Sequence, residues 1–276
     1  MFRTVLVHVD NRAGSAERTR FAVSLARQFE AGLIGLTAGL PRLPVEVYAD
    51  GFGSIALGPE YTEFDRKHVE AEFGQTAAAF RQLTDGSGVE TSWRAVFEAP
   101  SVAVIRAAAA ADLVVLGTGD TSLIGDFVSP SAGDIVLHTG RPILLAPHGR
   151  DRIDVKNVVI AWKDTAEAQR AVADALPFMK RAGSVVVVQV KEDAAGAPDL
   201  ADTQAFLKRH GIGAKTQIIQ RGSASVADAI IDFARKSEAD LIVSGAYGHT
   251  RMREWIFGGV TRGLLTRSPI PCLFSH

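Results

Sequence analysis

Three segments of this chain occur twice, in the same order along the sequence. The matching pairs are residues 3–10 with 156–164, 101–117 with 225–245, and 140–148 with 268–276. The last pair reads GRPILLAPH and SPIPCLFSH, an apolar stretch that ends on a histidine both times. An ordered repeat of this length indicates duplication of one folding unit. We therefore predict two similar domains, 1–148 and 152–276, joined by a polar linker within PHGRDRID.

Each half alternates short apolar runs with stretches of helical periodicity. In the second half the apolar runs lie at 155–162, 184–190, 214–220, 241–244 and 272–274, and the helical stretches at 166–182, 200–210, 225–236 and 259–266. The apolar runs lack strict alternation, as expected for strands that helices cover on both faces. Strand–helix alternation favours a parallel sheet with right-handed crossovers. The predicted fold class is α/β, with two doubly wound domains, each a five-stranded parallel sheet flanked by helices.

Composition narrows the classes of function. The chain has 276 residues and a formal net charge of −1, which gives no general attraction to nucleic acid or to a membrane surface. No apolar stretch has the length of a membrane-spanning helix, and MFRTVLVHVD has an aspartate where a signal peptide would stay apolar. The single cysteine, Cys272, excludes an intrachain disulfide. We expect a cytoplasmic protein that has neither a nucleic acid nor a membrane as partner.

The most informative stretch is SGAYGHTRMREWIFGGVTRGLL, residues 244–265, which follows a predicted strand. Ligands of doubly wound sheets bind at the carboxyl ends of the strands. Glycines there let backbone N–H groups approach an anion, and a helix N-terminus adds further donors. Against one acid, Glu254, the stretch carries four basic side chains: His249, Arg251, Arg253 and Arg262. It could hold a phosphate group; equally, the glycines could form turns and the arginines a solvated face.

The pattern Gly245-x2-Gly248-x9-Gly258, after a short apolar strand, resembles a loop of the universal stress protein family. The starting strands, the SVA…ADL segments and the closing strands extend the resemblance over the whole chain, which looks like two fused universal stress domains. The resemblance implies an intramolecular pseudo-dimer, since family members commonly pair through the closing strand. We expect the two sheets to stay separate rather than to form one continuous sheet.

The resemblance also implies a ligand site. In ATP-binding members this loop holds the phosphates and ribose, so the second half is expected to bind ATP, with Mg²⁺, or a related adenine nucleotide. The implied binding residues are Gly245, Gly248, His249, Arg251, Gly258, Gly259 and Val260. Residues at the end of each first strand would neighbour the adenine, the ribose or a metal: Ala161, Trp162, Lys163 and Asp164, and in the first half Asp10.

The sequence departs from the family pattern in both halves. ATP-binding members place Ser or Thr after the third glycine, where this chain has Gly259, and an aspartate at the first strand end, where the second half has Lys163. The first half keeps Asp10, but its loop GTGDTSLIGDFVSPSAGD carries Asp120 and Asp126, which would repel a polyphosphate. We expect a weakened site in the second half and a lost one in the first.

Other residues have structural interpretations beside the functional ones. Asp10 could cap the helix that follows it, Trp162 suits a core or an interface, and His8 suits a hydrogen-bonded core position. No metal-protease, nucleophile-elbow or P-loop motif occurs, so we assign no catalytic residue and no metal site.

The predicted function is a cytoplasmic stress-response protein that acts by binding rather than by turnover. One alternative is an interaction or structural module without nucleotide, which contacts a partner through the pseudo-dimer surface or the Gly/Pro-rich insertion at 39–59. Another is a slow ATPase. Self-association, inside the chain or as a homodimer, is a further expectation.

Overall fold

The structure is a computed structural model that describes residues 1–41, 59–118, 129–191, 200–248 and 259–276. Most of the insertion at 39–59 therefore lies outside the described residues, together with Asp120 and Asp126. The described part of the first half forms strands β1 (Thr4–His8), β2 (Gly32–Ala38), β3 (Thr91–Val96), β4 (Leu113–Gly117) and β5 (Ile143–Ala146). Its helices are α1 (Ser15–Phe29), α2 (Pro59–Thr84), α3 (Pro100–Ala107), the short 3-10 helix η1 (Ala108–Ala110) and α4 (Ala132–His138).

The second half follows the same plan. Its strands are β6 (Asn157–Ala161), β7 (Ser184–Lys191), β8 (Ala214–Gln220), β9 (Leu241–Gly245) and β10 (Cys272–Ser275). Its helices are α5 (Ala166–Asp174), α6 (Leu176–Met179), α7 (Ala201–Arg209), α8 (Val226–Lys236) and α9 (Gly259–Arg267). The single helix predicted at 166–182 is wrong, because Pro177 in the first turn of α6 has no N–H to continue the helical hydrogen bonds.

The strand order is the same in the two halves. It runs β3-β2-β1-β4-β5 in the first half and β8-β7-β6-β9-β10 in the second, and the pairs within each half are parallel. The central strands β1, β4, β6 and β9 are almost entirely buried, which explains why their sequences lack alternation. The prediction of two doubly wound α/β domains with five-stranded parallel sheets is confirmed.

The two sheets are not separate, and the expectation on this point is wrong. Strand β10 pairs antiparallel with β5, with Leu273 opposite Leu144, and this pair joins the halves into one ten-stranded sheet. Both strands are fully buried, so their edge N–H and C=O groups need partners, and each strand supplies those of the other. The contact through the closing strands is the one that the resemblance implied, and it makes the chain a pseudo-dimer. Cys272, at this junction, is 1% exposed.

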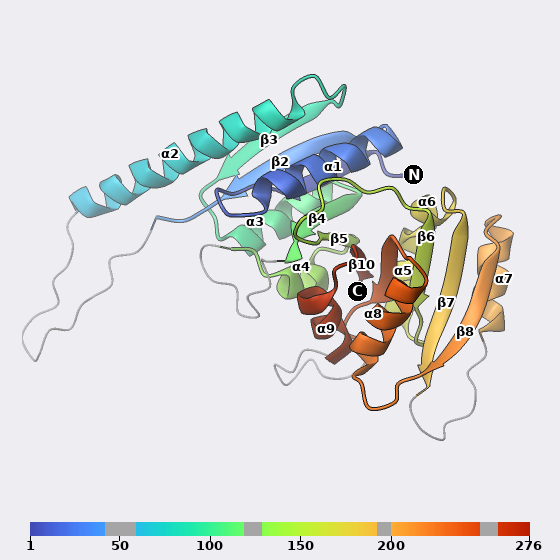
Figure 1. The fold of residues 1–276 in the computed structure, drawn as a ribbon. Helices are drawn as coiled ribbons and strands as arrows, with labels where there is room; N and C mark the ends of the chain where they lie inside the picture. The colour runs from blue at the N-terminus through green and yellow to red at the C-terminus, as the bar shows by residue number, and fades with distance from the viewer. Residues whose placement is uncertain (42–58, 119–128, 192–199, 249–258) are drawn as a thin grey trace, which may run out of the picture.

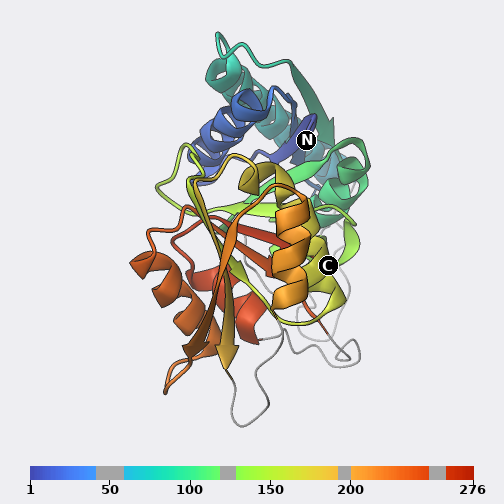
Figure 2. The same cartoon turned by 90° about the vertical axis from the view of Figure 1, so that its right-hand side faces the viewer.

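Helices cover both faces of the sheet (Figures 1 and 2). Helices α1, α2, α5, α6 and α7 pack on one face, and α3, α4, α8 and α9 on the other, so that two buried hydrophobic clusters run across the junction between the halves. On the first face a triangle of aromatic rings bridges the halves. Phe2 and Phe29 of the first half lie 5.3 Å and 5.1 Å, centroid to centroid, from Phe178 of α6. The junction is therefore stabilised by side-chain packing as well as by strand pairing.

Candidate functional site

The glycine stretch of the second half begins at the carboxyl end of β9. Strand β9 lies between β6 and β10, next to the point where the strand order reverses, which is where doubly wound sheets bind ligands. Gly245 ends the strand, and Ala246 to Gly248 lead away from it. His249, Arg251 and Gly258, three of the implied binding residues, lie outside the described residues, as does Arg253.

Gly245 is in close contact with helix α5. A Cβ built on Gly245 would lie 2.5 Å from the backbone nitrogen of Ala168 and 2.9 Å from its Cα. Backbone atoms cannot move aside as the end of a flexible side chain can. The strand end therefore needs glycine to pack against the first turn of α5, whether or not a ligand is present.

Replacing Gly245 by alanine is accordingly expected to destabilise the fold. Overpacking of this kind typically lowers the free energy of unfolding by about 1–3 kcal/mol. Urea denaturation followed by circular dichroism measures the loss. Gly183→Ala is a suitable control, since a Cβ there would meet its nearest atom at 3.8 Å. Equal stability of the Gly245→Ala and Gly183→Ala variants would contradict the packing role.

Gly248 faces a carboxylate. A Cβ on Gly248 would lie 2.9 Å from Oε2 of Glu167 and 3.2 Å from Oγ1 of Thr165. Thr165 is the N-cap of α5, and its hydroxyl accepts a hydrogen bond from Ala168 N–H at 3.3 Å. Sequence reasoning missed Glu167 as a neighbour of the loop. The signal was a helix start with an acid in its first turn, which by itself indicates only capping.

The loop is tied to the helix that follows it. Tyr247 has a left-handed backbone with φ of 58°, and its N–H donates to Oγ1 of Thr261 in α9 at 3.3 Å. Gly259 is the first residue of α9 and is exposed, and no atom of the described residues lies within 4 Å of a Cβ built on it; Val260 beside it is half-buried. The first turn of α9 thus stands next to the described part of the glycine loop, Gly245 to Gly248.

The strand-end residues of the second half divide into buried and exposed ones. Ala161 is buried, and the Trp162 side chain packs partly buried against the core, while the Trp162 backbone N–H donates to Val188 O at 2.8 Å. The core interpretation of Trp162 therefore agrees with its surroundings. Lys163 and Asp164 are exposed beyond the strand end.

The corresponding place in the first half is a buried polar cluster. Arg18 of α1 lies 3.2 Å from Oδ2 of Asp10, and its Nε donates to His8 O at 2.8 Å. Asp10 does not cap α1, whose N-cap is Gly14; instead its Oδ1 accepts from Arg12 N–H at 3.1 Å. Burial raises the pKa of the Asp10 carboxyl, but Arg18, His8 and this hydrogen bond outweigh it and hold that pKa below its usual value.

His8 is the unusual member of this cluster. It is 1% exposed, its Nδ1 lies 3.6 Å from Oδ2 of Asp10, and neither ring nitrogen makes a hydrogen bond with the described residues. His8 is therefore a core residue, as predicted. The hydrogen bonds expected for its ring are not made with the described residues. Burial and the positive charge of Arg18 lower the pKa of His8 to about 3, so its imidazole is neutral at physiological pH.

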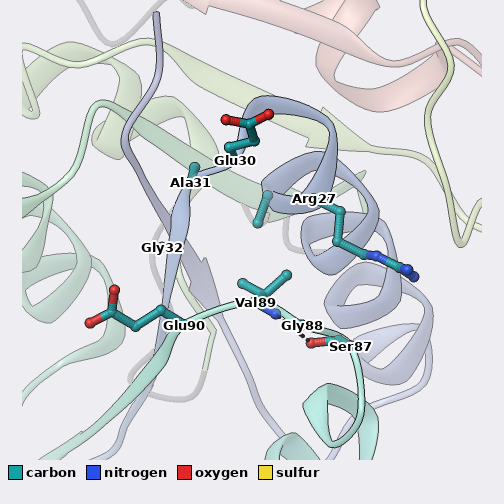
Figure 3. A pocket seen from close by; sticks show the side chains of 9 residues that line it. Arg27, Glu30, Ala31, Gly32, Ser87, Gly88, Val89 and Glu90 are labelled. Carbon is teal, nitrogen blue, oxygen red and sulfur yellow. Dashed lines mark hydrogen bonds between the residues drawn. The ribbon is translucent and has the colours of Figure 1, made fainter.

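A hollow of about 400 Å³ lies at the opposite end of the first-half strands (Figure 3). Among the residues that line it are Gly32 at the start of β2, Gly88 and Glu90 just before β3, and Glu30 directly after α1. The Glu30 and Glu90 side chains point away from each other (Figure 3). Because this is the amino-terminal end of the strands and no polar groups converge there, the glycine loop remains the candidate site.

Among the described residues, no group of three or more His, Cys, Asp or Glu side chains is placed to hold a metal ion. In the same part of the chain, none of the helices is both long and apolar enough to cross a bilayer.

Comparison with known proteins agrees with this fold. Universal stress protein Slr1230 of Synechocystis sp. (strain ATCC 27184 / PCC 6803 / Kazusa) is 24% identical over 174 residues, which are 59% of this chain and 57% of that protein. The alignment thus spans little more than half of this relative. The crystal structure of a universal stress protein from Archaeoglobus fulgidus DSM 4304 superposes with a TM-score of 0.70 at 16% identity, over 99% of this chain and 95% of that one.

A universal stress protein solved in complex with cAMP aligns with 52% of this chain and 97% of its own length, at 21% identity and a TM-score of 0.36. The sequence model described as the universal stress protein family matches residues 1–147 and again residues 154–276. Because these two matches cover almost the whole chain, the protein belongs to the universal stress protein family and consists of tandem universal stress domains.

Proposed function

We propose that the second half binds an adenine nucleotide at the carboxyl end of β9 and that the protein acts in the stress response by binding rather than by turnover. The observation that carries the proposal is the junction of the glycine loop with α9, where Tyr247 N–H donates to Thr261 Oγ1. This contact holds the loop beside a nine-residue helix whose first N–H groups have no intrahelical partners. Such a helix start, next to a glycine loop at the switch point of the sheet, suits a phosphate group.

The ligand would be held mainly by backbone groups. On this proposal the phosphates lie against Gly245, Gly248, Gly258 and Gly259, with His249, Arg251 and Val260 nearby, and Lys163 and Asp164 lie at the mouth of the site. The adenine or ribose would neighbour Ala161 and Trp162, and Mg²⁺ would accompany ATP through Asp164. We place the protein in the cytoplasm.

The direct test is to identify the ligand that the protein carries. Protein purified rapidly without added nucleotide is denatured, and the released small molecules are identified by mass spectrometry. We expect an adenine nucleotide in an amount comparable to that of the protein. Absence of any nucleotide, together with no binding of ATP, ADP, AMP or cAMP in calorimetry, would refute the proposal and favour an interaction module that needs no nucleotide.

Replacing Gly259 by serine is expected to tighten nucleotide binding. No described residue would contact the new side chain, and a hydroxyl there can donate one more hydrogen bond to a phosphate oxygen. A net gain of about 0.5–1.5 kcal/mol corresponds to roughly 2- to 12-fold in Kd. Isothermal titration calorimetry measures it.

Gly74→Ser is the matched control, because Gly74 also lies in a helix with no atom within 4 Å of a built Cβ, but on α2 of the first half. Binding by this variant should equal that of the wild type. An unchanged Kd in Gly259→Ser would count against phosphate binding at the start of α9.

A further inference from the structure

Strand β8 forms an open edge of the ten-stranded sheet (Figure 1). Among the described strands it pairs with β7 alone, and neither proline nor glycine interrupts its seven residues. The strand is exposed along most of its length, with only Ala214 and Ile219 partly covered, and Ile218 is 41% exposed. An exposed edge of this kind presents backbone N–H and C=O groups to any strand that is added beside it.

Two backbone carbonyls of β8 accept hydrogen bonds from side chains instead of from a neighbouring strand. Gln204 Nε2 donates to Ala214 O at 2.8 Å, and Gln217 Nε2 donates to Ile218 O at 3.2 Å. Because alternate residues of a strand direct their backbone groups to the same side, Thr216 faces the open side as well. Both glutamines are exposed, so N–H groups of an added strand can replace their amides.

The surroundings of this edge are basic. Residues 175–191 and 203–227, which contain β7, β8 and the residues before each strand, include no aspartate and no glutamate. At the amino-terminal ends of the two strands they carry exposed basic side chains: Lys180, Arg181, Lys208, Arg209 and Lys215. Arg181 also lies over the Phe29 ring, 5.4 Å from its centroid. We call these side chains and the open side of β8 the basic edge.

The nearest acids on the same side of the sheet lie away from the basic edge. Asp154 and Asp240 precede β6 and β9, and β6 is two strands, about 10 Å, from β8. Asp154 pairs with Lys156 at 3.2 Å, and Asp240 Oδ2 accepts from Asn157 N–H at 2.9 Å. Glu238, also before β9, follows the basic last turn of α8. The acids at this side therefore do not cancel the charge beside β8.

Acids at the carboxyl end of β7 and β8 limit the basic edge in that direction. Asp202 lies in the first turn of α7, and the connection from β7 to α7 carries Glu192, Asp193 and Asp199 outside the described residues. The positive charge is therefore concentrated at the amino-terminal part of the edge, around Lys215.

The other open edge of the sheet, β3, has a mixed charge. The residues that precede β2 and β3 include both basic and acidic side chains: Arg27, Glu30, Arg81, Asp85 and Glu90. Helices α1, α2, α7 and α8 all end in a basic last turn. Helix ends alone therefore do not produce an acid-free edge, and the basic edge is a property of the second half.

We propose that the basic edge is a docking site for an extended acidic segment of a partner protein, which adds to β8 as a further strand. Strand addition supplies backbone hydrogen bonds to the open side, and acidic side chains of the segment lie against Lys208, Arg209 and Lys215. The open backbone groups favour a peptide over a nucleic acid or a lipid, which lack the N–H and C=O groups of a strand. Lysine on an exposed edge also opposes pairing of two copies through β8. This site does not depend on the proposed nucleotide site.

Fluorescence anisotropy with the full chain tests the proposal. The probe is a labelled peptide of alternating threonine and glutamate, as long as β8. The control probes are its threonine–lysine counterpart and a fully N-methylated version of the acidic peptide. We expect saturable binding of the acidic probe that weakens as salt screens the charges, and no binding of either control. N-methylation removes the N–H donors and keeps the glutamates, so it distinguishes strand addition from attraction by charge alone.

Matched variants test the residues of the edge. Lys215→Glu should weaken binding of the acidic probe by roughly 5- to 30-fold, because one attraction is lost and one repulsion is gained at an exposed site. Arg94→Glu makes the same change on the exposed edge strand β3 and should leave the Kd unchanged. Thr216→Pro removes an N–H group on the open side and none that faces β7, so it should weaken binding although the charge is unchanged. Circular dichroism of each variant establishes that it is folded.

Several results would overturn the proposal. They are failure of the wild type to bind the acidic probe, equal losses in Lys215→Glu and Arg94→Glu, and binding of the N-methylated probe as tightly as the unmodified one. Oligothymidylate or phosphatidylserine vesicles that bind as tightly as the acidic probe would overturn the choice of a peptide partner and assign the edge to anionic surfaces in general. If Thr216→Pro unfolds, the N-methylated probe decides whether a strand is added.

Discussion

Replacing Phe178 by alanine is expected to lower the free energy of unfolding by about 3–5 kcal/mol, the usual loss for a fully buried phenylalanine. Phe178 is 1% exposed and contacts Phe2 and Phe29 of the other half, with ring centroids 5.3 Å and 5.1 Å away. Its removal leaves a cavity at the junction of the two domains. Urea denaturation followed by circular dichroism measures the loss.

Two further measurements show whether the lost stability comes from contacts across the junction or only from removing a buried phenylalanine. Phe206 of α7 is only partly buried and contacts His210 within the second half, so Phe206→Ala should cost less. A double-mutant cycle of Phe178→Ala with Phe29→Ala should show a coupling of about 0.5–1.5 kcal/mol, as for other aromatic pairs. Additive losses would mean that the ring contacts across the junction add nothing to the hydrophobic burial.

The first half should lose stability in mild acid through His8. Burial and Arg18 lower the pKa of His8 from 6.5 to about 3. Between these values the unfolded chain binds a proton at this residue and the folded chain does not, so stability falls as the pH drops, by about 1.4 kcal/mol per pH unit. From pH 6.5 to pH 5 the loss from His8 alone is about 2 kcal/mol. Asp10, whose pKa is lowered in the folded state, adds a loss only below about pH 4.

The variant His8→Ala isolates this contribution, because the second half carries Ala161 at the equivalent strand position. We expect its stability relative to the wild type to rise by about 2 kcal/mol between pH 6.5 and pH 5, measured by urea denaturation at each pH. Leu6→Ala removes a fully buried side chain two residues earlier on the same strand and should cost the same at both pH values. If the His8→Ala and wild-type curves run parallel over this range, His8 is charged in the folded protein or reaches solvent.

The two halves have diverged at equivalent places in the fold. The first strand of the first half ends in a buried cluster of His8, Asp10 and Arg18, whereas that of the second half ends in Ala161 and exposed Lys163. Asp10 is paired with Arg18 and so is less available to a ligand than a free strand-end carboxylate. This asymmetry supports placing the proposed nucleotide site in the second half.

The sequence alone determined the duplication, the α/β class and the strands of each domain. These properties follow from patterns along the sequence, namely the repeated segments and the alternation of apolar runs with helical stretches. The family resemblance added the contact between closing strands. All of the implied binding residues stay predictions, and His249, Arg251 and Gly258 also lie outside the described residues.

Only the tertiary structure decided which groups come together across long stretches of chain. Strands β5 and β10 pair because each lies at an edge of its own half and the two edges face each other. No local sequence pattern predicts that arrangement. In the same way, the sequence pattern indicates that Gly245 and Gly248 bind a ligand, but they also lie against Ala168 and Glu167, about eighty residues earlier in the chain. The physical reason is that sequence patterns report the preference of each segment for strand or helix. Close approach, burial and charge depend on how those segments pack.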